Sequence, residues 1–453
     1  MRKTRKSAFL LLAALMLMIS ACSNSSGGSG GGSGSDGAQS GNQNGTDNSG
    51  TTNPPKNKDT FTITISDKIE HGIVTADKET AKKNEKVELT ITPENEYELS
   101  SICIISSDES KKYLTGRGNS IIVNMPEDDI TIAATFDLPP NTLLTTLPAG
   151  TDGTAGEEWT YVLLGDYPQT VKAKDITVND ERYIIRGKYK YMQGSDDAWY
   201  YKCKQEHSIF DRTYTYSDGT EVTKDDKDKE QYFKVEPIKW RVLTDDYNDK
   251  KLLLAEKALF WSLFDNWSSN TRIINNTTVY PNNYEYSYVR ERLNDEFLNT
   301  AFSKKAQKQI CDTLVINDVE STLPTNYSTL VEPDNISYVL PKDGKNDYVC
   351  SDTTDKIFLL SMKEVTTVDY GFDTKLNVDF EEESTKAHSS TDYFLATIGF
   401  DNNYAEDWFL RSPYSGTLSW GNSKYGICSV SKKNISVFSV HVKVGVVPAL
   451  CVE

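Results

Sequence analysis

The residue with the clearest chemistry in this sequence is Cys22, whose thiol directly follows a short apolar segment. Basic residues precede that segment, which covers residues 8–19, and Ser20 and Ala21 are the small residues before the cysteine. The segment is shorter than the ~20 residues that span a bilayer, but it is typical of a secretory signal. The pattern predicts that a signal peptide, residues 1–21, is removed and that Cys22 carries lipid such as palmitate. An apolar helix that only packs or anchors is the alternative.

The segment after the cysteine predicts a flexible connection. Residues 22–58 hold the lipidated cysteine and a stretch rich in Gly and Ser, in which Ala38 carries the only apolar side chain. Such a stretch buries too little surface to fold. We therefore expect a disordered tether that attaches the protein through its N-terminal lipid to the cell membrane or the outer membrane, outside the cytoplasm. The choice of membrane and leaflet stays open.

Four residues near the C-terminus could contact a ligand: Trp408, Arg411, Tyr414 and Trp420. Aromatic faces stack on sugars or on apolar side chains, and an arginine fork pairs with carboxylates. We expect a glycan or a protein as the ligand of such a surface. The alternative is that Trp408 and Arg411 belong to the internal framework of the domain.

A short acidic stretch could offer oxygen ligands to calcium, which takes six to eight of them. Its candidates are Asp401, Asn403, Glu406 and Asp407. The spacing is not that of an EF-hand, and a plain acidic loop is the alternative interpretation. The four histidines are scattered without the spacing of a metal site, so we expect no other metal and no cofactor.

The cysteines after Cys22 do not form the dense pattern of a disulfide scaffold. Cys103 falls in a small separate domain, which leaves an odd number for the large one. Cys428 and Cys451 are the candidate disulfide, and buried free thiols are the alternative.

Composition narrows the classes of function. The chain has 453 residues with 66 acidic and 49 basic side chains, and its formal net charge is −17. A strongly acidic surface disfavours nucleic acid as a partner, because phosphate binding needs positive charge. The sequence also contains no glycine-rich phosphate loop and no Gly-x-Ser-x-Gly turn. We therefore assign no catalytic residue.

Changes in composition divide the rest of the chain into three parts. Residues 59–137 alternate apolar and polar side chains with period two over 61–65, 87–91 and 130–136, which predicts a small all-β domain. Residues 138–157 are rich in Pro, Gly and Thr and predict a linker. The remainder forms one large domain.

The large domain, residues 158–453, mixes helical and strand patterns, which favours an α+β fold. Helical spacing of apolar residues predicts a helix over 288–298, with others after Ser303, after Ser361 and over 391–398. Strands are expected over these ranges: 161–169, 238–243, 251–255, 357–360, 408–410, 425–430, 435–444 and 446–450. A hairpin is expected around Asp218-Gly219.

Motif order gives the small domain a family resemblance. It contains Gly72-Ile73-Val74, then Pro93 to Leu99, then Asn124 to Ile130 with Ala134-x-Phe136. This order resembles the bacterial repeat domain related to the internalin B-repeat. The resemblance implies a spacer or stalk in a surface protein.

Six ordered blocks in the large domain resemble the bacterial domain of unknown function 6273. They are Leu164–Gln169, Glu236–Leu243, Leu293–Ser303, Asp355–Ser361, Trp408–Pro413 and Gly445–Leu450. That family brings no established activity. The chain departs from it at Val447, where the family usually has arginine.

The closing layout of this domain is also similar to the C-type-lectin-like fold of formylglycine-generating enzymes and bacterial adhesins. Cys428 and Cys451 do not match the cysteines that the enzymes need, so that activity is not expected here. Taken together, the sequence predicts a non-catalytic, lipid-anchored surface protein that displays a binding or adhesion domain. An envelope enzyme that acts on cell-wall glycans and a purely structural envelope protein are the alternatives.

Overall fold

The computed structural model describes residues 59–148, 159–206, 213–266, 270–327, 344–376, 385–398, 406–418, 424–431 and 434–453. Contacts divide the chain into residues 1–57 and 58–453, and all described residues belong to the second unit. Cys22 and the expected tether therefore lie outside the described residues. In the described part, no helix is long and apolar enough to cross a bilayer.

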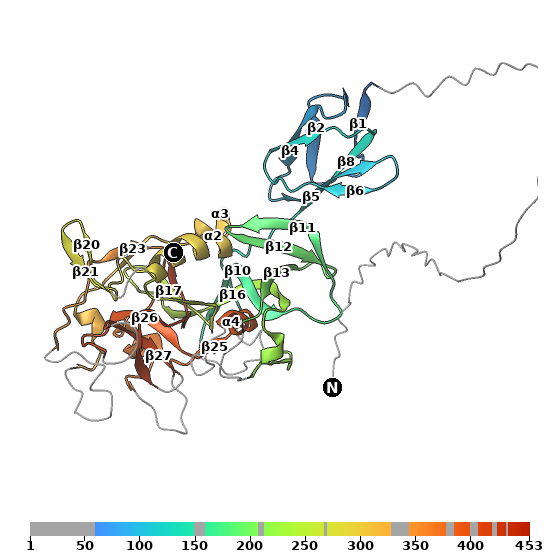
Figure 1. Ribbon diagram of the computed structural model, residues 1–453. Helices are drawn as coiled ribbons and strands as arrows, with labels where there is room; N and C mark the ends of the chain where they lie inside the picture. Colours follow the sequence, from blue (N-terminus) through green and yellow to red (C-terminus); the bar gives the residue numbers. More distant parts are fainter. Residues whose placement is uncertain are drawn as a thin grey trace, which may run out of the picture. The chain divides into compact units, whose positions relative to one another are not determined.

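The N-terminal described region consists of two β-sheets (Figure 1). One has the order β3-β1-β8-β5-β6 and the other β2-β4-β7. The strands are β1 (Phe61–Ile65), β2 (Gly72–Ala76), β3 (Thr80–Ala81), β4 (Lys86–Pro93), β5 (Glu98–Ser106), β6 (Lys111–Tyr113), β7 (Ser120–Asn124) and β8 (Ile130–Asp137).

Alternation of side chains explains this pair of sheets. Along β4, buried Val87, Leu89 and Ile91 alternate with exposed residues, so one face of the strand enters the core. Ile102 and Ile132 from the other sheet are also fully buried in the same cluster. The three strands expected from the sequence are confirmed as β1, β4 and β8.

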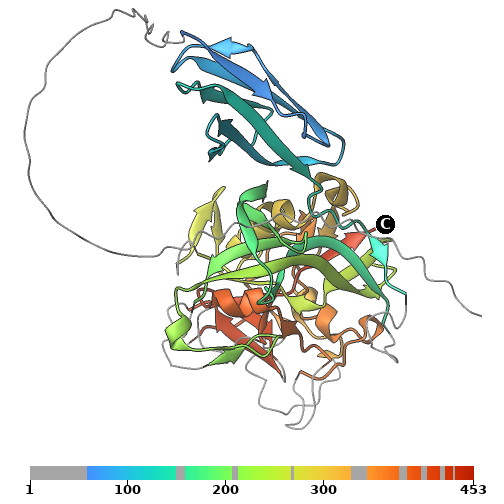
Figure 2. The same ribbon diagram turned by 90° about the vertical axis from the view of Figure 1, so that its right-hand side faces the viewer.

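The C-terminal domain contains a nine-stranded sheet whose neighbouring strands are antiparallel. Its order is β11-β12-β13-β16-β17-β30-β24, with β10 beside β16 and β9 beside β10. The long strands, green in Figure 2, curve across the domain. The members are β9 (Thr145–Thr146), β10 (Tyr161–Val171), β11 (Val178–Arg186), β12 (Tyr189–Gly194), β13 (Trp199–Lys204), β16 (Glu230–Thr244), β17 (Lys251–Ala255), β24 (Ile357–Phe358) and β30 (Ala449–Val452).

A second sheet of five strands has the order β19-β29-β26-β27-β28, with β26 and β29 parallel. Its strands are β19 (Phe260–Ser262), β26 (Trp408–Pro413), β27 (Gly426–Val430), β28 (Ile435–Ser439) and β29 (Val444–Val446). Four two-stranded pairs complete the domain: β14 (Tyr214–Thr215) with β15 (Glu221–Val222), β18 (Lys257–Ala258) with β25 (Ser389–Ser390), β20 (Arg272–Ile274) with β21 (Thr277–Val279), and β22 (Thr313–Val315) with β23 (Thr353–Asp355).

The helices of the described residues are few and short. They are α1 (Tyr288–Arg292), the π-helical turn η2 (Leu293–Phe297), α2 (Leu298–Ala301), α3 (Lys304–Gln307), α4 (Asp392–Ile398) and the 3₁₀ turns η1 (Lys224–Asp226), η3 (Glu320–Thr322), η6 (Glu364–Thr366) and η7 (Val368–Tyr370). The domain is thus mostly strand with a minor helical part.

Most of the predicted elements are confirmed, but several differ. The strand expected over 446–450 is divided between β29 and β30, with Val447 and Pro448 in neither, and the strand expected over 357–360 ends at Phe358. The strand expected over 435–444 is interrupted by a turn between β28 and β29, because Val442 N–H donates back to Ser439 O (3.0 Å). The capping residues Ser361 and Glu364 do bond reciprocally, as expected. They begin only the single 3₁₀ turn η6 rather than a longer helix.

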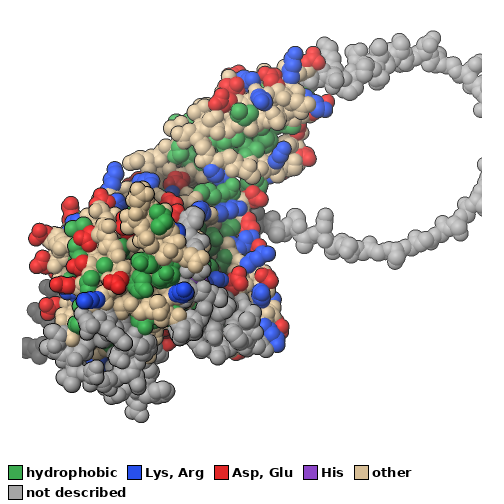
Figure 3. Space-filling model, turned by 60° about the vertical axis from the view of Figure 1, so that its left-hand side comes forward, with side chains coloured by type: hydrophobic (Ala, Val, Ile, Leu, Met, Phe, Trp, Pro, Cys, Tyr) green, Lys and Arg blue, Asp and Glu red, His purple; other side chains and the backbone are tan. Residues whose placement is uncertain are grey.

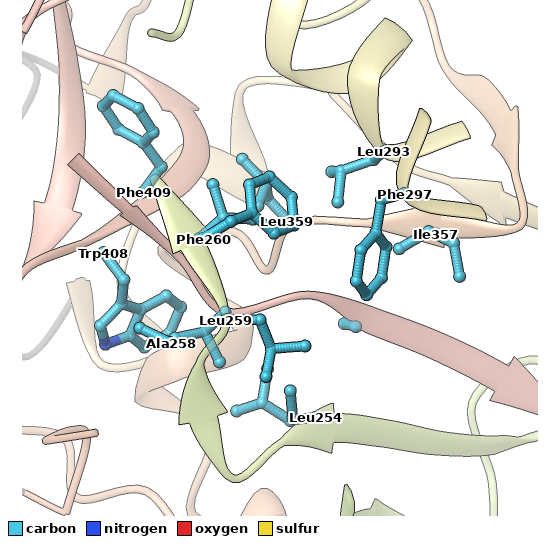
Figure 4. Packing of buried hydrophobic residues seen from close by; sticks show 14 of the residues in the cluster. Leu254, Ala258, Leu259, Phe260, Leu293, Phe297, Ile357, Leu359, Trp408 and Phe409 are labelled. Atoms are coloured by element: carbon cyan, nitrogen blue, oxygen red, sulfur yellow. The ribbon is translucent and has the colours of Figure 1, made fainter. Parts of the chain in front are cut away.

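The core of the C-terminal domain joins both sheets to the helices (Figure 4). Leu293 and Phe297 extend from the helical segment toward Ile357, and Trp408 and Phe409 point to opposite sides of β26. All these residues are essentially fully buried. Because helix, sheet and C-terminal strands share one core, the loops between them are held in place by the same packing.

A group of tyrosines belongs to the same core, where the ring of Tyr167 stands edge-on to Phe297. Tyr189 Oη is 3.0 Å from Tyr167 Oη and 2.8 Å from Tyr393 Oη, so the three hydroxyls form a chain. The ring of Tyr191 stands edge-on to Tyr189, and the ring of Tyr201 stacks on Tyr189 and stands edge-on to Tyr393. Much of the high tyrosine content therefore fills the interior.

The residues expected to form a linker make specific contacts where they are described. Thr142 N–H and Oγ1–H both donate to Asp166, at 2.8 and 2.6 Å. Leu144 N–H donates to Gln309 (3.0 Å), and β9 pairs with β10. Residues 142–146 are therefore part of the nine-stranded sheet and its surroundings.

Candidate functional site

Two of the four residues expected at a binding surface are buried instead. Trp408 and Arg411 lie on β26, where every residue from Trp408 to Pro413 is buried. Trp408 Nε1–H donates to Lys386 O (3.2 Å), and its ring stands edge-on to His388. The expectation that these two side chains face a ligand is wrong, because both faces of β26 are covered, and the alternative of an internal framework holds.

Arg411 is the centre of a buried polar network. Its guanidinium grips Glu364 with two hydrogen bonds, Nη1 to Oε2 (2.5 Å) and Nη2 to Oε1 (2.9 Å). It also donates to Leu359 O and Ile316 O, at 2.7 and 3.1 Å. Tyr247 Oη–H donates to Glu364 as well (2.7 Å). The network joins β26 to the segments around residues 316, 359 and 364.

Electrostatics keep this pair ionised. Burial alone would raise the pKa of Glu364, but the charge of Arg411 and the hydrogen bonds from Arg411, Ser361 and Tyr247 outweigh it and hold that pKa below its usual value. Burial likewise disfavours the charged guanidinium, but the carboxylate raises the pKa of Arg411 beyond its already high value. The network is a structural clamp without an open side for a ligand.

Tyr414 is partly exposed at the end of β26, as a binding residue should be. Its N–H donates to Gly426 O (3.1 Å), so the start of β27 lies beside it. A Cβ on Gly426 would approach Tyr414 to about 3.2 Å, so the ring packs closely on that glycine. Trp420, the fourth expected residue, lies outside the described residues.

Three other tyrosines gather near Tyr414, and we call Tyr280, Tyr348 and Tyr425 the tyrosine trio. Each is partly exposed. Their ring centroids are separated by 4.9 Å (Tyr280 to Tyr348), 5.6 Å (Tyr280 to Tyr425) and 5.7 Å (Tyr348 to Tyr425). Tyr348 stands almost perpendicular to both neighbours, at 85° and 82°. The trio thus forms an aromatic corner at the protein surface.

Two buried asparagines hold the segments that carry the trio. Asn282 Nδ2–H₂ donates to Gly426 O (3.0 Å) and to Tyr414 O (3.4 Å), which ties the turn after Tyr280 to the β26–β27 pair. Asn346 Nδ2–H₂ donates to Pro413 O (2.9 Å), and its Oδ1 accepts from Tyr348 N–H (3.1 Å). Because both amides are buried, the ring positions are fixed by the fold.

No pattern in the sequence predicts this trio. Its members lie on three segments far apart in the chain, and no spacing pattern links them. The chain contains 25 tyrosines, and this number alone does not distinguish the trio from the buried tyrosines around Tyr189. Tertiary structure separates the exposed tyrosines from the buried ones.

The calcium candidates are only partly within the described residues. Asp401 and Asn403 lie outside them, and Glu406 is exposed. Asp407 is buried, and burial together with the charge of Glu406 raises the pKa of Asp407 to about 7. In the described residues, no three or more His, Cys, Asp or Glu side chains are grouped to hold a metal ion.

A polar cleft of about 510 Å³ lies beside the helical segment. Its lining residues are Glu285, Tyr286, Ser287, Arg290, Glu291, Asn294, Leu298, Asp312, Thr354, Asp355 and Lys356. Arg290 bridges to Asp355, with Nη2 2.7 Å and Nε 2.8 Å from Oδ1. Burial opposes the charge of Arg290, but the hydrogen bond and charge of Asp355 raise the pKa of Arg290. The cleft therefore combines a fixed ion pair with further exposed carboxylates.

The predicted pairing of Cys428 with Cys451 is wrong. Cys428 lies on β27 of the five-stranded sheet and Cys451 on β30 of the nine-stranded sheet, and both thiols are free and buried. Burial raises the pKa of each thiol to about 12.

Of the comparisons with known proteins, one matches the part of the chain that holds the tyrosine trio, the cleft and Arg411. No curated protein and no solved structure matches the chain. Four of the six sequence blocks fall within the matched family region, while Leu164–Gln169 and Glu236–Leu243 precede it. Residues 248–453 match the model of the family described as domain of unknown function (DUF6273).

Proposed function

We propose that this protein is a lipoprotein, tethered outside the cytoplasm through Cys22, whose C-terminal domain binds a carbohydrate at the tyrosine trio. The observation that carries this proposal is the convergence of Tyr280, Tyr348 and Tyr425 at the surface. The backbone of Tyr414 is hydrogen-bonded to Gly426, the residue after Tyr425. The lectin-like likeness of the closing motifs and the repeat-like character of residues 59–137 belong to the same proposal.

The chemistry of the trio suits a sugar. A pyranose ring offers C–H groups on its faces and hydroxyls around its edge, and a tyrosine ring offers an apolar face with a polar rim. Two perpendicular rings let one stack on the sugar face while the other contacts its edge. Rings fixed by Asn282 and Asn346 lose little conformational freedom on binding, which favours affinity.

The surface of the protein is also compatible with exposure outside the cell. Acidic and basic side chains are both spread over the face in Figure 3, with apolar side chains between them. A flexible connection of Gly and Ser over residues 23–58 would hold the domain away from the lipid surface, and residues 59–137 would act as a spacer.

The test is a glycan array probed with the full-length lipidated protein in detergent micelles. We expect binding to a defined set of sugars, and we expect Tyr348→Ala or Tyr425→Ala to weaken it about tenfold, or ~1.4 kcal/mol. Tyr113→Ala, which changes a tyrosine on β6 with 37 % exposure, is the matched control and leaves binding unchanged.

Two results would count against the carbohydrate proposal. Binding that survives substitution of both Tyr348 and Tyr425, in variants with unchanged melting temperature, would place the ligand elsewhere. Binding to proteins on a parallel array with no sugar signal would make the trio a protein-docking site.

A second candidate function is catalysis in the polar cleft. Glu285, Glu291 and Asp312 supply carboxylates beside the Arg290–Asp355 pair, and hydrolysis of glycans commonly uses two carboxyl groups. The observation that favours this candidate is the concave site itself, since enzymes act in clefts that surround their substrate.

Incubation with a cell-wall preparation tests whether the cleft is catalytic. Release of soluble fragments that is lost in Glu291→Gln and retained in Glu221→Gln, an exposed glutamate on β15, would support an enzyme. Equal release by the natural protein and both variants, or no release by any of them, would exclude catalysis in the cleft.

A further inference from the structure

Cys451 has a cysteine neighbour other than the one expected from the sequence. Cys311 N–H donates to Cys451 O (2.8 Å), next to an antiparallel bridge between Ile310 and Val452. This register places Cys311 directly opposite Cys451. Opposed residues on antiparallel strands have Cα atoms roughly 4.5–5.5 Å apart and side chains on the same face, and a disulfide spans Cα separations of about 4.4–6.8 Å.

Both backbones at this point are firmly held. Lys356 Nζ donates to Ile310 O (2.7 Å), and Lys250 Nζ donates to Asp312 O, so contacts fix the residues on either side of Cys311. Cys451 lies on β30, which pairs with β17 on one side and with β24 on the other. The two cysteines therefore stay opposite each other.

We propose that Cys311 and Cys451 form a disulfide bond that fastens the segment after α3 to strand β30. The oxidant is a small-molecule or protein disulfide, the class of oxidant that acts outside the cytoplasm. The Cys311 thiolate attacks one sulfur of this disulfide, which forms a mixed disulfide and releases one thiolate. The Cys451 sulfur then attacks Cys311 Sγ, the S–S bond forms, and the second thiolate leaves. The two protons pass to the two released thiolates.

The order of these steps follows from exposure. Cys311 is partly exposed, whereas Cys451 is fully buried. Burial raises the pKa of the Cys451 thiol to about 12, although a hydrogen bond with Thr313 and the charge of Lys250 oppose the shift. An external disulfide therefore meets Cys311 first, and the buried thiol resolves the intermediate from within.

The remaining described cysteines occupy other elements. Cys103 is on β5, Cys203 on β13, Cys350 before β23 and Cys428 on β27. This distribution makes the proposal specific, since one cross-link is expected at one pair of positions.

The test treats the full-length protein with oxidised glutathione, unfolds it in guanidinium chloride, blocks the free thiols with N-ethylmaleimide at mildly acidic pH and maps unreduced peptides by mass spectrometry. We expect a peptide that joins Cys311 to Cys451, two hydrogens lighter than its reduced parts, and maleimide on Cys103, Cys203, Cys350 and Cys428. Maleimide on both Cys311 and Cys451, or a link from either to a different cysteine, would overturn the proposal.

A stability measurement provides an independent check. Reduction with dithiothreitol should lower the melting temperature of the oxidised protein by about 5 °C, because the cross-link restricts the unfolded chain. Cys428→Ser should retain this difference, and Cys311→Ser should lose it. A Cys311→Ser variant that keeps the full response to dithiothreitol would contradict the assignment, even if the protein binds no sugar at all.

Discussion

At the scale of single residues, the burial of a side chain determines whether it can reach a ligand. Arg411 has the chemistry to recognise a carboxylate ligand, but the carboxylate it recognises is that of Glu364 inside the same domain. The sequence specified the residue types and their strand correctly. It did not specify that both faces of β26 are covered, because a strand buried on both sides shows no polar alternation that would reveal an exposed face.

Loss of the buried arginine should be costly. We predict that Arg411→Met lowers the free energy of unfolding by about 3–5 kcal/mol, because Glu364 is left charged and buried without its partner. Urea unfolding measures the change. Lys363→Met, which removes an exposed ion pair with Glu320, is the neighbouring control and should cost less than about 1 kcal/mol. Equal effects of the two substitutions would refute the clamp.

His388 should make the domain sensitive to acid. Burial and the charge of Arg241 lower the pKa of His388 to about 3, while its Nδ1 lies 3.1 Å from Glu256 O. An unfolded histidine titrates near pH 6.5. The depressed pKa means that this contribution to stability is complete above pH 6.5 and is lost progressively as the pH falls from 6.5 toward 3.

The substitution His388→Asn keeps a donor for Glu256 O and removes the titrating ring. We expect a shallower fall of the melting temperature between pH 7 and pH 4 than in the natural protein. His71→Asn, which changes an exposed histidine of the N-terminal β-domain, serves as the control and should leave the slope unaltered. A slope unchanged by His388→Asn would show that other groups cause the acid sensitivity.

At the scale of elements, the helical segment over residues 288–301 contains a feature beyond its apolar spacing. The sequence correctly predicted a helix there, but its middle is the π-helical turn η2. Within that turn, Asn294 Nδ2–H₂ donates to Arg290 O (3.1 Å) and Ile357 O (2.9 Å), and Oδ1 accepts from Lys356 N–H and Ile357 N–H. One amide therefore joins the helix to β24.

Spacing rules could not reveal this turn, because a single extra residue per turn changes the apolar pattern too little. The same limit applies to the tyrosine trio, which needs three loops to meet. Local patterns predicted the strands, the hairpin at Asp218-Gly219 and the Ser303 cap, since each depends on neighbours in sequence. Contacts between distant segments, such as Cys311 with Cys451, had no local signal.

Asn294 offers a test of the element. We predict that Asn294→Ala lowers the free energy of unfolding by about 2–3 kcal/mol, because backbone groups of β24 lose their partners. Asn299→Ala removes a partly exposed amide of the same helical segment, which hydrogen-bonds to Asp295, Lys304 and Gln307, and should change it by less than about 0.5 kcal/mol. Chemical unfolding of both variants measures these changes. Similar losses of unfolding free energy in the two variants would show that Asn294 does not connect the helix to β24.

At the scale of the whole molecule, the expected architecture depends on Cys22. A lipid on this residue would fix an acidic, water-exposed protein to a membrane, and two or more acyl chains would make the attachment stable. The domain boundaries came from composition, which detects where a chain can and cannot bury surface. The mostly β character of the C-terminal domain was less visible, because its short strands and short helices give similar apolar runs.

The anchor makes a simple prediction. Cys22→Ser should shift the protein from the membrane fraction to the soluble fraction of cells. Mass spectrometry of the mature protein without this substitution should find acyl chains on its N-terminal peptide. Cys103→Ser should remain with the membrane. An intact Met1, or a bare Cys22 thiol on protein from the cytosol, would contradict the lipoprotein assignment.

The position of β30 between β17 and β24 has a consequence for synthesis. The nine-stranded sheet stays open until residues 449–452 have been made, long after β17 has left the ribosome. A nascent chain that lacks these residues leaves β17 and β24 without the strand between them, so the nine-stranded sheet cannot be completed before translation ends. Such late closure implies slow folding, as expected for pairings between distant segments, and it would keep a chain threadable through a translocation channel.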